Sequence, residues 1–376
     1  MASTPPGYNR PVGQGPVTRE QEKAIAHACP GSAVAAWPRE GAVDAYWGPY
    51  KRVLSGRATD ELVRFEGSSG GAISGLLIHA LESGLVDRVL HVAPDLEDPT
   101  RNAIAISKTS SEVIARAGSR YTASSPLAQI ERALADGGRM AFVGKPCDAS
   151  ALRRLGEVDP RVSQHIPLII SFFCGGIPSH AGVGRILSAM QVEAASVREF
   201  RYRGRGWPGN AVAVTDAGRA VEMSYAESWG DYLSKEVQFR CKICPDAVGG
   251  VADIACADAW YGDDRGYPSF AEQDGRSLIV SRTDAGERLL ASAIAAGAVS
   301  AEPLDIAEIE KMQPSQARRK RLVFARTLAL RLILQPRPRM DGLRVEDAAR
   351  RAPLKDTLRD VVGTLRRTLL GRRSRL

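Results

Sequence analysis

The sequence lacks several features that would assign it to a common class of protein. No apolar run approaches the ~20 residues needed to span a membrane, and residues 1–15 lack the basic-then-apolar order of a secretory signal. The five histidines form no H-x-x-H or H-E-x-x-H pattern, and six cysteines in 376 residues are too sparse for a disulfide scaffold. These absences argue against a membrane-spanning protein, a disulfide-stapled domain and a histidine metal site. We therefore expect a cytoplasmic protein.

Positive charge is concentrated at the C-terminal end. Residues 318–376 contain 18 Lys and Arg against 5 Asp and Glu, a net charge of +13, whereas the remaining residues carry 33 against 38, a net charge of −5. Because the body is slightly acidic, we expect no nucleic-acid partner. Any anionic partner should lie at the C-terminal tail.

The tail ends in a basic segment with helical periodicity. Its apolar residues between positions 354 and 370 fall on roughly one face of a helix. A basic amphipathic helix can lie on an anionic membrane, so the sequence predicts peripheral contact with the inner membrane surface. Packing of the same helix on the body or on a partner is an equally open interpretation.

Four of the six cysteines lie in segments bordered by glycine or proline, which favours a metal site. They are Cys147 in GKPC, Cys174 in FFCGG, and Cys241 and Cys244 in CKICPD. Four converging thiolates bind a [4Fe–4S] cluster or a zinc ion; four unrelated buried thiols are the remaining interpretation. Zinc sites more often use two close pairs of cysteines, and this chain has one, so the spacing favours iron–sulfur over zinc.

The other two cysteines are expected to play no part in such a site. Cys256 lies in an alternating strand pattern, typical of a buried core thiol. Cys29 precedes Pro30, as at the end of a bacterial ferredoxin run, but the three upstream cysteines are missing. We therefore expect no N-terminal ferredoxin cluster.

Alternating helix and strand patterns predict an α/β fold. We expect a mixed sheet flanked by helices, with an antiparallel insertion over 197–225 and a helical, basic C-terminal tail. Two predicted strands, 140–143 and 168–173, run directly into Cys147 and Cys174. Because sites of open α/β sheets gather where strands end in loops, both thiols should lie at one edge.

Two loops have the composition of ligand-binding loops. Residues 67–72 (GSSGGA) precede a predicted helix, whose N-terminus favours phosphate, although Ser-Gly turns also cap helices without any ligand. Lys108 and Lys145 are candidate charge partners for a phosphate or a flavin; a solvated side chain is the plainer interpretation of each. Residues 203–209 (RGRGWPG) can close over a planar anion, or form a surface turn.

Taken in order, these segments resemble the coenzyme F420 hydrogenase/dehydrogenase β-subunit family over roughly residues 65–283. The version here looks most like the bacterial branch that is often found alongside polysaccharide-biosynthesis proteins. Many relatives carry an N-terminal ferredoxin module that is absent here, which implies an outside, ferredoxin-like electron donor. The matching segments are 67–88, 108–113, 118–126, 144–147, 173–176, 201–209 and 240–261.

The resemblance implies an α/β flavoprotein that contains FAD and at least one [4Fe–4S] cluster. The implied cluster ligands are Cys147, Cys174, Cys241 and Cys244. The implied flavin-binding residues are Ser69, Gly70, Gly71, Ala72, Lys108, Ser119, Tyr121, Lys145 and Asp258. Cys256 stands where relatives often have a small apolar residue, so a role as an alternative ligand is open beside the core-thiol interpretation.

We expect the flavin to exchange hydride with a small-molecule acceptor or with the deazaflavin F420. The candidate catalytic residues are Lys145, Arg203, Arg205 and Trp207, of which the last three would line the acceptor site. The rival hypothesis is a zinc-stapled or metal-free binding subunit of a polysaccharide-biosynthesis assembly.

The expected organisation has five parts. They are a disordered leader (1–18), an N-terminal segment in the place of the ferredoxin module (19–64), a flavin and iron–sulfur oxidoreductase domain (65–283), a helical region (284–335) and a basic amphipathic tail (336–376).

Overall fold

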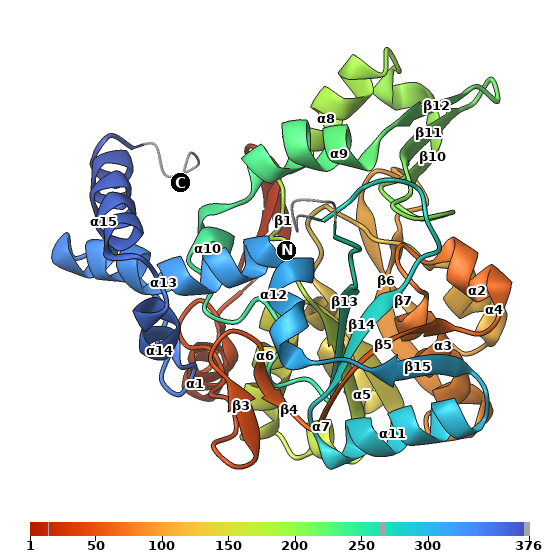
Figure 1. Ribbon diagram of the computed structural model, residues 1–376, viewed down its shortest axis with the longest axis horizontal. Coiled ribbons are helices and arrows are strands. Elements are labelled where there is room, and N and C mark those ends of the chain that lie inside the picture. Colours follow the sequence, from red (N-terminus) through yellow and green to blue (C-terminus); the bar gives the residue numbers. More distant parts are fainter. Residues whose placement is uncertain (14, 263–267, 372–376) are drawn as a thin grey trace.

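An eight-stranded mixed sheet forms the centre of the computed structural model, which describes residues 1–13, 15–262 and 268–371 (Figure 1). In spatial order its strands are β15 (Val299–Pro303), β5 (Arg52–Ala58), β14 (Ser277–Ser281), β13 (Ile254–Asp258), β9 (Leu168–Phe172), β8 (Met140–Val143), β6 (Arg88–Pro94) and β7 (Asn102–Ser107). The four central strands β13, β9, β8 and β6 are parallel, and the outer pairings are antiparallel. The predicted mixed α/β sheet is confirmed.

Both faces of the sheet are covered by helices. On β9, Leu168 and Ile170 pack into one apolar cluster, and Ile169 packs into the cluster on the opposite face. The first face is covered by α2 (Glu61–Glu66), α3 (Ala72–Glu82), α4 (Ser110–Ala115) and α11 (Asp284–Ala295). The opposite face is covered by α5 (Ile130–Ala135), α6 (Pro146–Gly156), α7 (Arg161–His165), α12 (Ile309–Met312), α13 (Pro314–Leu332) and α14 (Val345–Arg350). Burial on both faces explains why the central strands read as continuous apolar runs.

A smaller unit with its own apolar cluster lies above the carboxyl edge of the sheet (Figure 1). It contains the antiparallel strands β10 (Val197–Arg201), β11 (Ala211–Thr215) and β12 (Ala220–Met223), the helix α8 (His180–Ala189) and the short helix α9 (Tyr225–Glu227). The sequence predicts the first two strands of this insertion but not β12. A further short helix, α10 (Phe239–Lys242), carries the chain back toward the main sheet.

The N-terminal residues differ from the expected disordered leader. They form a hairpin of β1 (Ala2–Thr4) and β2 (Tyr8–Arg10). The hairpin is attached to the smaller unit, because the hydroxyl of Tyr8 donates to the carbonyl oxygen of Glu236 at 2.7 Å and the N–H of His180 donates to that of Gly7 at 3.1 Å. These long-range contacts order a segment whose composition alone indicates disorder. Next come α1 (Arg19–Ala28), which packs on α6, and the hairpin β3 (Ala42–Asp44) and β4 (Gly48–Tyr50).

The sheet also crosses two of the expected boundaries. β5 lies in the segment 19–64, and β15 lies in 284–335, which we expected to be helical; the two strands pair with each other. The sheet therefore begins before residue 65 and ends after residue 283.

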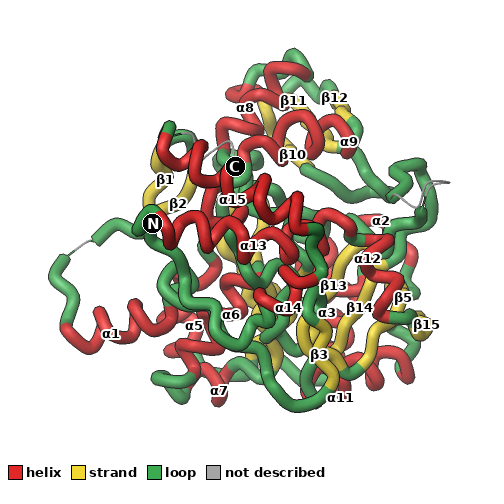
Figure 2. The backbone as a smooth tube through the Cα atoms, turned by 60° about the vertical axis from the view of Figure 1, so that its left-hand side comes forward, coloured by secondary structure: helices red, strands yellow, loops and turns green. Residues whose placement is uncertain are grey.

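The basic tail is packed on the body. Leu343, Val345 and Ala348 are buried in the main core, and α15 (Leu354–Leu369) lies across α13 (Figure 2). Arg326 and Asp360 join the two helices by an ion pair of 2.6 Å. One face of α15 thus packs on the body, and membrane contact by its exposed face stays a prediction. Within the described residues, no helix has the length and apolar character required to cross a membrane.

Candidate functional site

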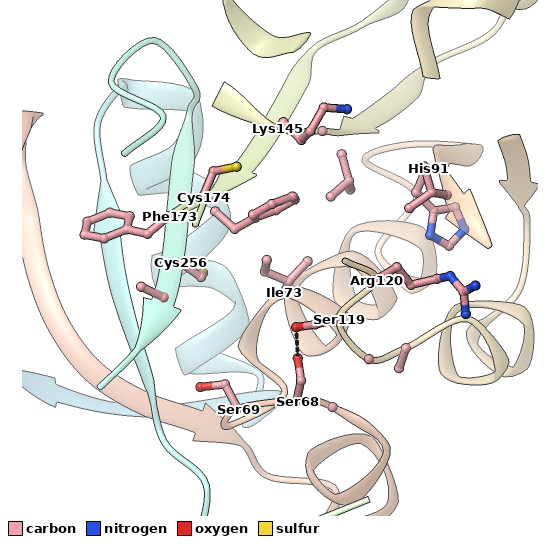
Figure 3. A pocket seen from close by; sticks show the side chains of 18 of the residues that line it. Ser68, Ser69, Ile73, His91, Ser119, Arg120, Lys145, Phe173, Cys174 and Cys256 are labelled. Atoms are coloured by element: carbon pink, nitrogen blue, oxygen red, sulfur yellow. Dashed lines mark hydrogen bonds between the residues drawn. The ribbon is translucent and has the colours of Figure 1, made fainter. Parts of the chain in front are cut away.

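A pocket lies at the carboxyl edge of the parallel strands. Its lining includes the segments that follow β8 and β9, the end of β13, and the loop 67–72 that leads into α3. Ser68 and Ser119, whose hydroxyl oxygens are 2.6 Å apart, lie toward one end of it, and Lys145 and Cys174 lie toward the other (Figure 3). Ligands of open α/β sheets bind at this edge, which makes the pocket the candidate site.

The loop 67–72 requires a glycine at position 71. Gly71 has a φ of +70°, and a Cβ there would lie 2.7 Å from the carbonyl oxygen of Val63. The N–H of Gly70 donates to Oγ of Ser277 at 3.0 Å, which ties the loop to the sheet. Helix α3 begins without a side-chain cap, so its first N–H groups are suited to an anionic group.

Lys145 is a buried cation at the pocket, with only 7% of its surface exposed. Its Nζ lies 2.6 Å from Oδ2 of Asp148 and donates to Oγ of Ser124 at 2.9 Å. Burial alone would lower the pKa of Lys145, but the carboxylate of Asp148 outweighs burial and raises it. The charged form of Lys145 is therefore favoured, which suits the side chain to binding an anion, and its catalytic assignment stays a prediction.

Most of the predicted flavin residues meet in this pocket. The lining contains Ser69, Gly71, Ala72, Ser119, Tyr121, Lys145 and Asp258. Gly70 and Lys108 are not among the lining residues. Lys108 precedes α4, and its backbone N–H donates to the carboxylate of Glu112 in the first turn of that helix. Flavin binding by these residues stays a prediction.

The loop 203–209 is joined to the pocket by hydrogen bonds to the carboxylate of Asp258. The guanidinium of Arg203, whose side chain is 2% exposed, donates to both oxygens of Asp258 at 2.8 and 2.7 Å, and Trp207 Nε1 donates to the same carboxylate at 3.1 Å. The rings of Tyr225 and Trp260 lie over the Arg203 guanidinium at 4.6 and 4.9 Å. Because Asp258 lines the pocket, Arg203 and Trp207 hold one of its polar groups in place.

Arg205 lies apart from this network. It is half-exposed and pairs with Glu66 and Glu199 at 3.2 and 3.3 Å. Arg203 and Arg205 line a neighbouring hollow and do not line the pocket, and Trp207 is also outside the pocket lining. The catalytic assignment of these three residues stays a prediction.

The four predicted cluster cysteines come from three segments that meet beside the pocket. Cys147 is the second residue of α6 after β8, Cys174 follows β9, and the CKIC pair lies in and just after α10. Cys174 interacts electrostatically with Cys147, Cys241 and Cys244. Strands that end at one edge of the sheet thus bring together thiols that are distant in the sequence.

The surroundings of these thiols suit a bound metal. The N–H of Gly176 points at Sγ of Cys174 and that of Ile177 at Sγ of Cys241, both at 3.4 Å. Burial raises the pKa of Cys147, and burial together with Cys241 raises that of Cys174 to about 12. N–H donors to sulfur and buried thiols are features of iron–sulfur and zinc sites.

No site for a single metal ion is preformed within the part of the chain that the structure describes. There, no three His, Cys, Asp or Glu side chains lie close enough together to hold an ion. The chemistry of the donor set fits a [4Fe–4S] cluster, in which each of four thiolates binds a different iron, so that the sulfur atoms lie farther apart than around a single ion.

Cys256 has different surroundings. It is buried in the apolar cluster on the α3 side of the sheet and also lines the pocket. Burial raises the pKa of its thiol to about 12. This placement agrees with the core-thiol interpretation.

Sequence reasoning missed several residues that act on the site. His91 and Arg120 line the pocket, and Gln316 and Arg319 of α13 bind the carbonyl oxygen of Cys174 at 3.0 and 2.7 Å. A sequence signal existed for the last two, because Gln316, Arg319 and Lys320 have the i, i+3, i+4 spacing of one helical face. No such signal marks His91 or Arg120.

The fold and the site define a class: a mixed α/β protein with a ligand pocket and a group of buried thiols at the carboxyl edge of its sheet. The chain belongs to the coenzyme F420 hydrogenase/dehydrogenase beta subunit family. The model of the family's N-terminal part matches residues 53–131, and that of its C-terminal part matches residues 137–307. The family is one of oxidoreductase subunits.

Three similar proteins illustrate the relationship. The coenzyme F420 hydrogenase subunit beta of Methanococcus voltae is 28% identical over 302 residues, which cover 76% of this chain and 98% of that protein. The F420-dependent formate dehydrogenase 1 subunit beta of Methanococcus maripaludis is 25% identical over 59% of this chain and 57% of its own length. A chain of the F420-reducing [NiFe] hydrogenase complex from Methanosarcina barkeri has the same fold, with a TM-score of 0.58, 22% identity and coverage of 76% of this chain and 96% of its own.

Proposed function

We propose that this chain is an electron-transfer subunit of an oxidoreductase, with FAD in the pocket and a [4Fe–4S] cluster at Cys147, Cys174, Cys241 and Cys244. The observation that carries the proposal is the position of the segment 174–177. It lines the pocket, and its N–H groups point at the sulfur atoms of Cys174 and Cys241. One segment thus borders both proposed cofactor sites.

The chemistry would come from the cofactors. When bound, the cluster would relay single electrons, and the flavin would collect two and exchange hydride with an organic acceptor or an F420-like deazaflavin. The protein's part is to bind and orient. Lys145 and the N-terminus of α3 would hold anionic groups of FAD, and Arg203 and Trp207 would keep Asp258 at the pocket. Arg205, which is half-exposed, remains our candidate for contact with the acceptor.

The proposed partners follow from the relatives and the resemblance. The similar hydrogenase chain belongs to a complex, so we infer that this chain also works with partner subunits. We further propose a ferredoxin-like electron donor. A role in surface polysaccharide biosynthesis rests solely on the resemblance to the bacterial branch of the family.

The first test is the composition of protein purified without oxygen. The proposal predicts a flavin absorbance band, a broad iron–sulfur shoulder beside it, and about four irons with matching sulfide per chain. A colourless protein that contains zinc would support the rival zinc-stapled subunit instead. A protein with neither metal nor flavin would contradict the redox proposal.

We also propose that α15 contacts an anionic membrane surface. The helix buries Thr364 and Thr368 against α13 and leaves an apolar stripe facing outward. That stripe consists of Leu354, Leu358, Val362 and Leu369, which are 56–73% exposed. A helix that buries its threonines and exposes its leucines is suited to an apolar surface outside the protein.

The charge beside the stripe favours lipid as the partner. Lys355, Arg359 and Arg366 are exposed on the same helix, at positions that border the stripe. Each basic residue near an anionic bilayer adds about 1 kcal/mol of binding free energy. The pattern is that of a helix lying in a membrane interface.

Flotation with liposomes that contain anionic lipid tests this contact. The double variant Leu358→Ser/Val362→Ser should lose binding, and Arg359→Gln/Arg366→Gln should bind less tightly. The matched control Leu85→Ser/Val158→Ser changes two exposed apolar residues elsewhere and should bind as the wild type does. Equal binding by all of these proteins, or no binding by the wild type, would contradict the proposal.

A further inference from the structure

Helix α13 lies beyond both segments matched by the family, yet it binds the cysteine loops directly. The family matches end at residue 307, and α13 spans Pro314–Leu332. Side chains from one stretch of this helix donate hydrogen bonds to backbone carbonyl oxygens on two separate cysteine segments. The arrangement thus joins α13 to both segments that carry the thiols.

The first segment is the one after β9. Arg319 donates from Nη1 to the carbonyl oxygen of Cys174 at 2.7 Å and from Nη2 to that of Gly175 at 2.6 Å. Gln316 donates to the same Cys174 oxygen at 3.0 Å. A planar guanidinium that binds two successive carbonyl groups fixes their direction as well as their position.

The second segment contains the CKIC pair. Lys320, a buried residue, donates to the carbonyl oxygen of Pro245 at 2.6 Å, and Arg326 donates to that of Lys242 at 2.8 Å. Lys320 also binds the carbonyl oxygen of Leu343 at 2.7 Å, which connects the chain after α13 to the same point.

We propose that α13 is a brace that holds the Cys174 loop and the Cys241–Cys244 loop in fixed relation, and that Arg319 is its principal positioning residue. The hydrogen bonds of the brace go to backbone carbonyl groups and not to the sulfur atoms. Arg319 also places a full positive charge beside the thiols, since it interacts electrostatically with both Cys174 and Cys244.

The two effects of Arg319 have separate consequences. Holding the loops orders the N–H groups that point at the sulfur atoms, and this part needs no cofactor. A cation stabilises the reduced, more negative state of a bound cluster, and so it raises the reduction potential. This second part rests on the proposed function.

Hydrogen exchange on metal-free protein tests the positional part. In Arg319→Gln, the amides of Gly176 and Ile177 should exchange at least tenfold faster than in the wild type, because the local structure opens more often. The matched control is Arg318→Gln, an exposed neighbour on the same helix, which should leave both amides unchanged. Equal exchange in the two variants would overturn the brace.

A conservative variant keeps the test decisive if Arg319→Gln fails to fold. Arg319→Lys retains the charge but cannot bind both carbonyl groups, so exchange should fall between wild type and Arg319→Gln. Wild-type exchange in Arg319→Lys would overturn the positioning role of the guanidinium.

The reduction potential of cluster-loaded protein tests the electrostatic part. Arg319→Gln should lower it by an amount equivalent to a tenfold change in the one-electron equilibrium, about 59 mV, and Arg319→Lys should restore most of the wild-type value. An unchanged potential in Arg319→Gln would overturn the electrostatic part. A protein that never binds a cluster would contradict the proposed function, while the exchange result would still decide the brace.

Discussion

Residues 53–307 and the helices that follow them contribute to the site in different ways. The family-matched part carries all four predicted cysteine ligands and every pocket-lining residue except Gln313. Helix α13, beyond the matched part, contributes side chains that bind the backbone of the cysteine segments. The groups proposed to bind cofactors are thus in the part shared with relatives, and groups that hold the cysteine segments lie in α13, outside it.

The largest effect should come from the cysteines of the family-matched part. Replacing Cys241 and Cys244 by Ser should abolish iron binding, because two of four ligands are lost. Iron and sulfide analysis after anaerobic purification measures this. Cys256→Ser is the matched control and should keep its iron. Iron retained in the double variant, or lost in the control, would show that the ligand set is wrong.

A large loss of stability should follow when the buried Arg203–Asp258 pair is broken. Asp258→Asn leaves the guanidinium of Arg203 buried without its counter-charge, which should lower the free energy of unfolding by about 3–5 kcal/mol. Urea denaturation measures the loss. For comparison, Asp360→Asn breaks the pair between α13 and α15 and should cost less than half as much, because Arg326 keeps its bond to the Lys242 carbonyl. Equal losses in Asp258→Asn and Asp360→Asn would contradict the prediction that the pair in the family-matched part contributes more to stability than the pair between α13 and α15.

The pocket histidine should make the stability of the family-matched part depend on pH. Burial, reinforced by Arg116, lowers the pKa of His91 to about 4, and its unfolded pKa is about 6.5. Between these values the unfolded chain binds a proton that the folded chain does not. The free energy of unfolding therefore falls as the pH drops from 6.5 toward 4, by up to about 3 kcal/mol from His91, and above pH 6.5 His91 causes no such loss.

Denaturation at several pH values, comparing wild type with His91→Gln, measures this contribution. The variant should lose less stability between pH 6.5 and 4, and the surface control His165→Gln should follow the wild type. Parallel curves for wild type and His91→Gln would contradict the prediction.

The smallest effect concerns the two lysines that the sequence indicates equally. Lys145 lines the pocket and Lys108 does not. Lys145→Gln should weaken FAD binding about tenfold, or about 1.4 kcal/mol, and Lys108→Gln should leave the affinity unchanged. Flavin fluorescence titration measures both. Unchanged affinity in Lys145→Gln, or an equal loss in Lys108→Gln, would contradict the prediction.

The sequence predicts the parts of the fold that depend on local pattern. The runs at 140–143 and 168–172 are apolar because both faces of β8 and β9 are buried, and their positions also predict where Cys147 and Cys174 lie. By contrast, β15 (VSAEP) is an edge strand with one buried residue, Val299, so its sequence carries little strand signal. Its pairing with β5 joins residues that are far apart in the sequence, so no local pattern predicts it.

In the site, too, the sequence predicts only what depends on local pattern. The position of the loop 67–72 follows from its glycines and the helix after it. The role of Arg203 does not, since only the fold brings it to Asp258 and between two aromatic rings. The contact of Arg319 with the Cys174 loop likewise joins segments that no local pattern relates.

The central claim is that electrons pass between the thiol-bound cluster and the pocket through adjoining sites. Its most direct test is the rate at which reduced ferredoxin reduces bound FAD, measured by stopped-flow absorbance without oxygen. We predict rapid flavin reduction in the wild type and a rate at least tenfold lower in flavin-loaded Cys241→Ser/Cys244→Ser. Equal rates in the two proteins would contradict the claim.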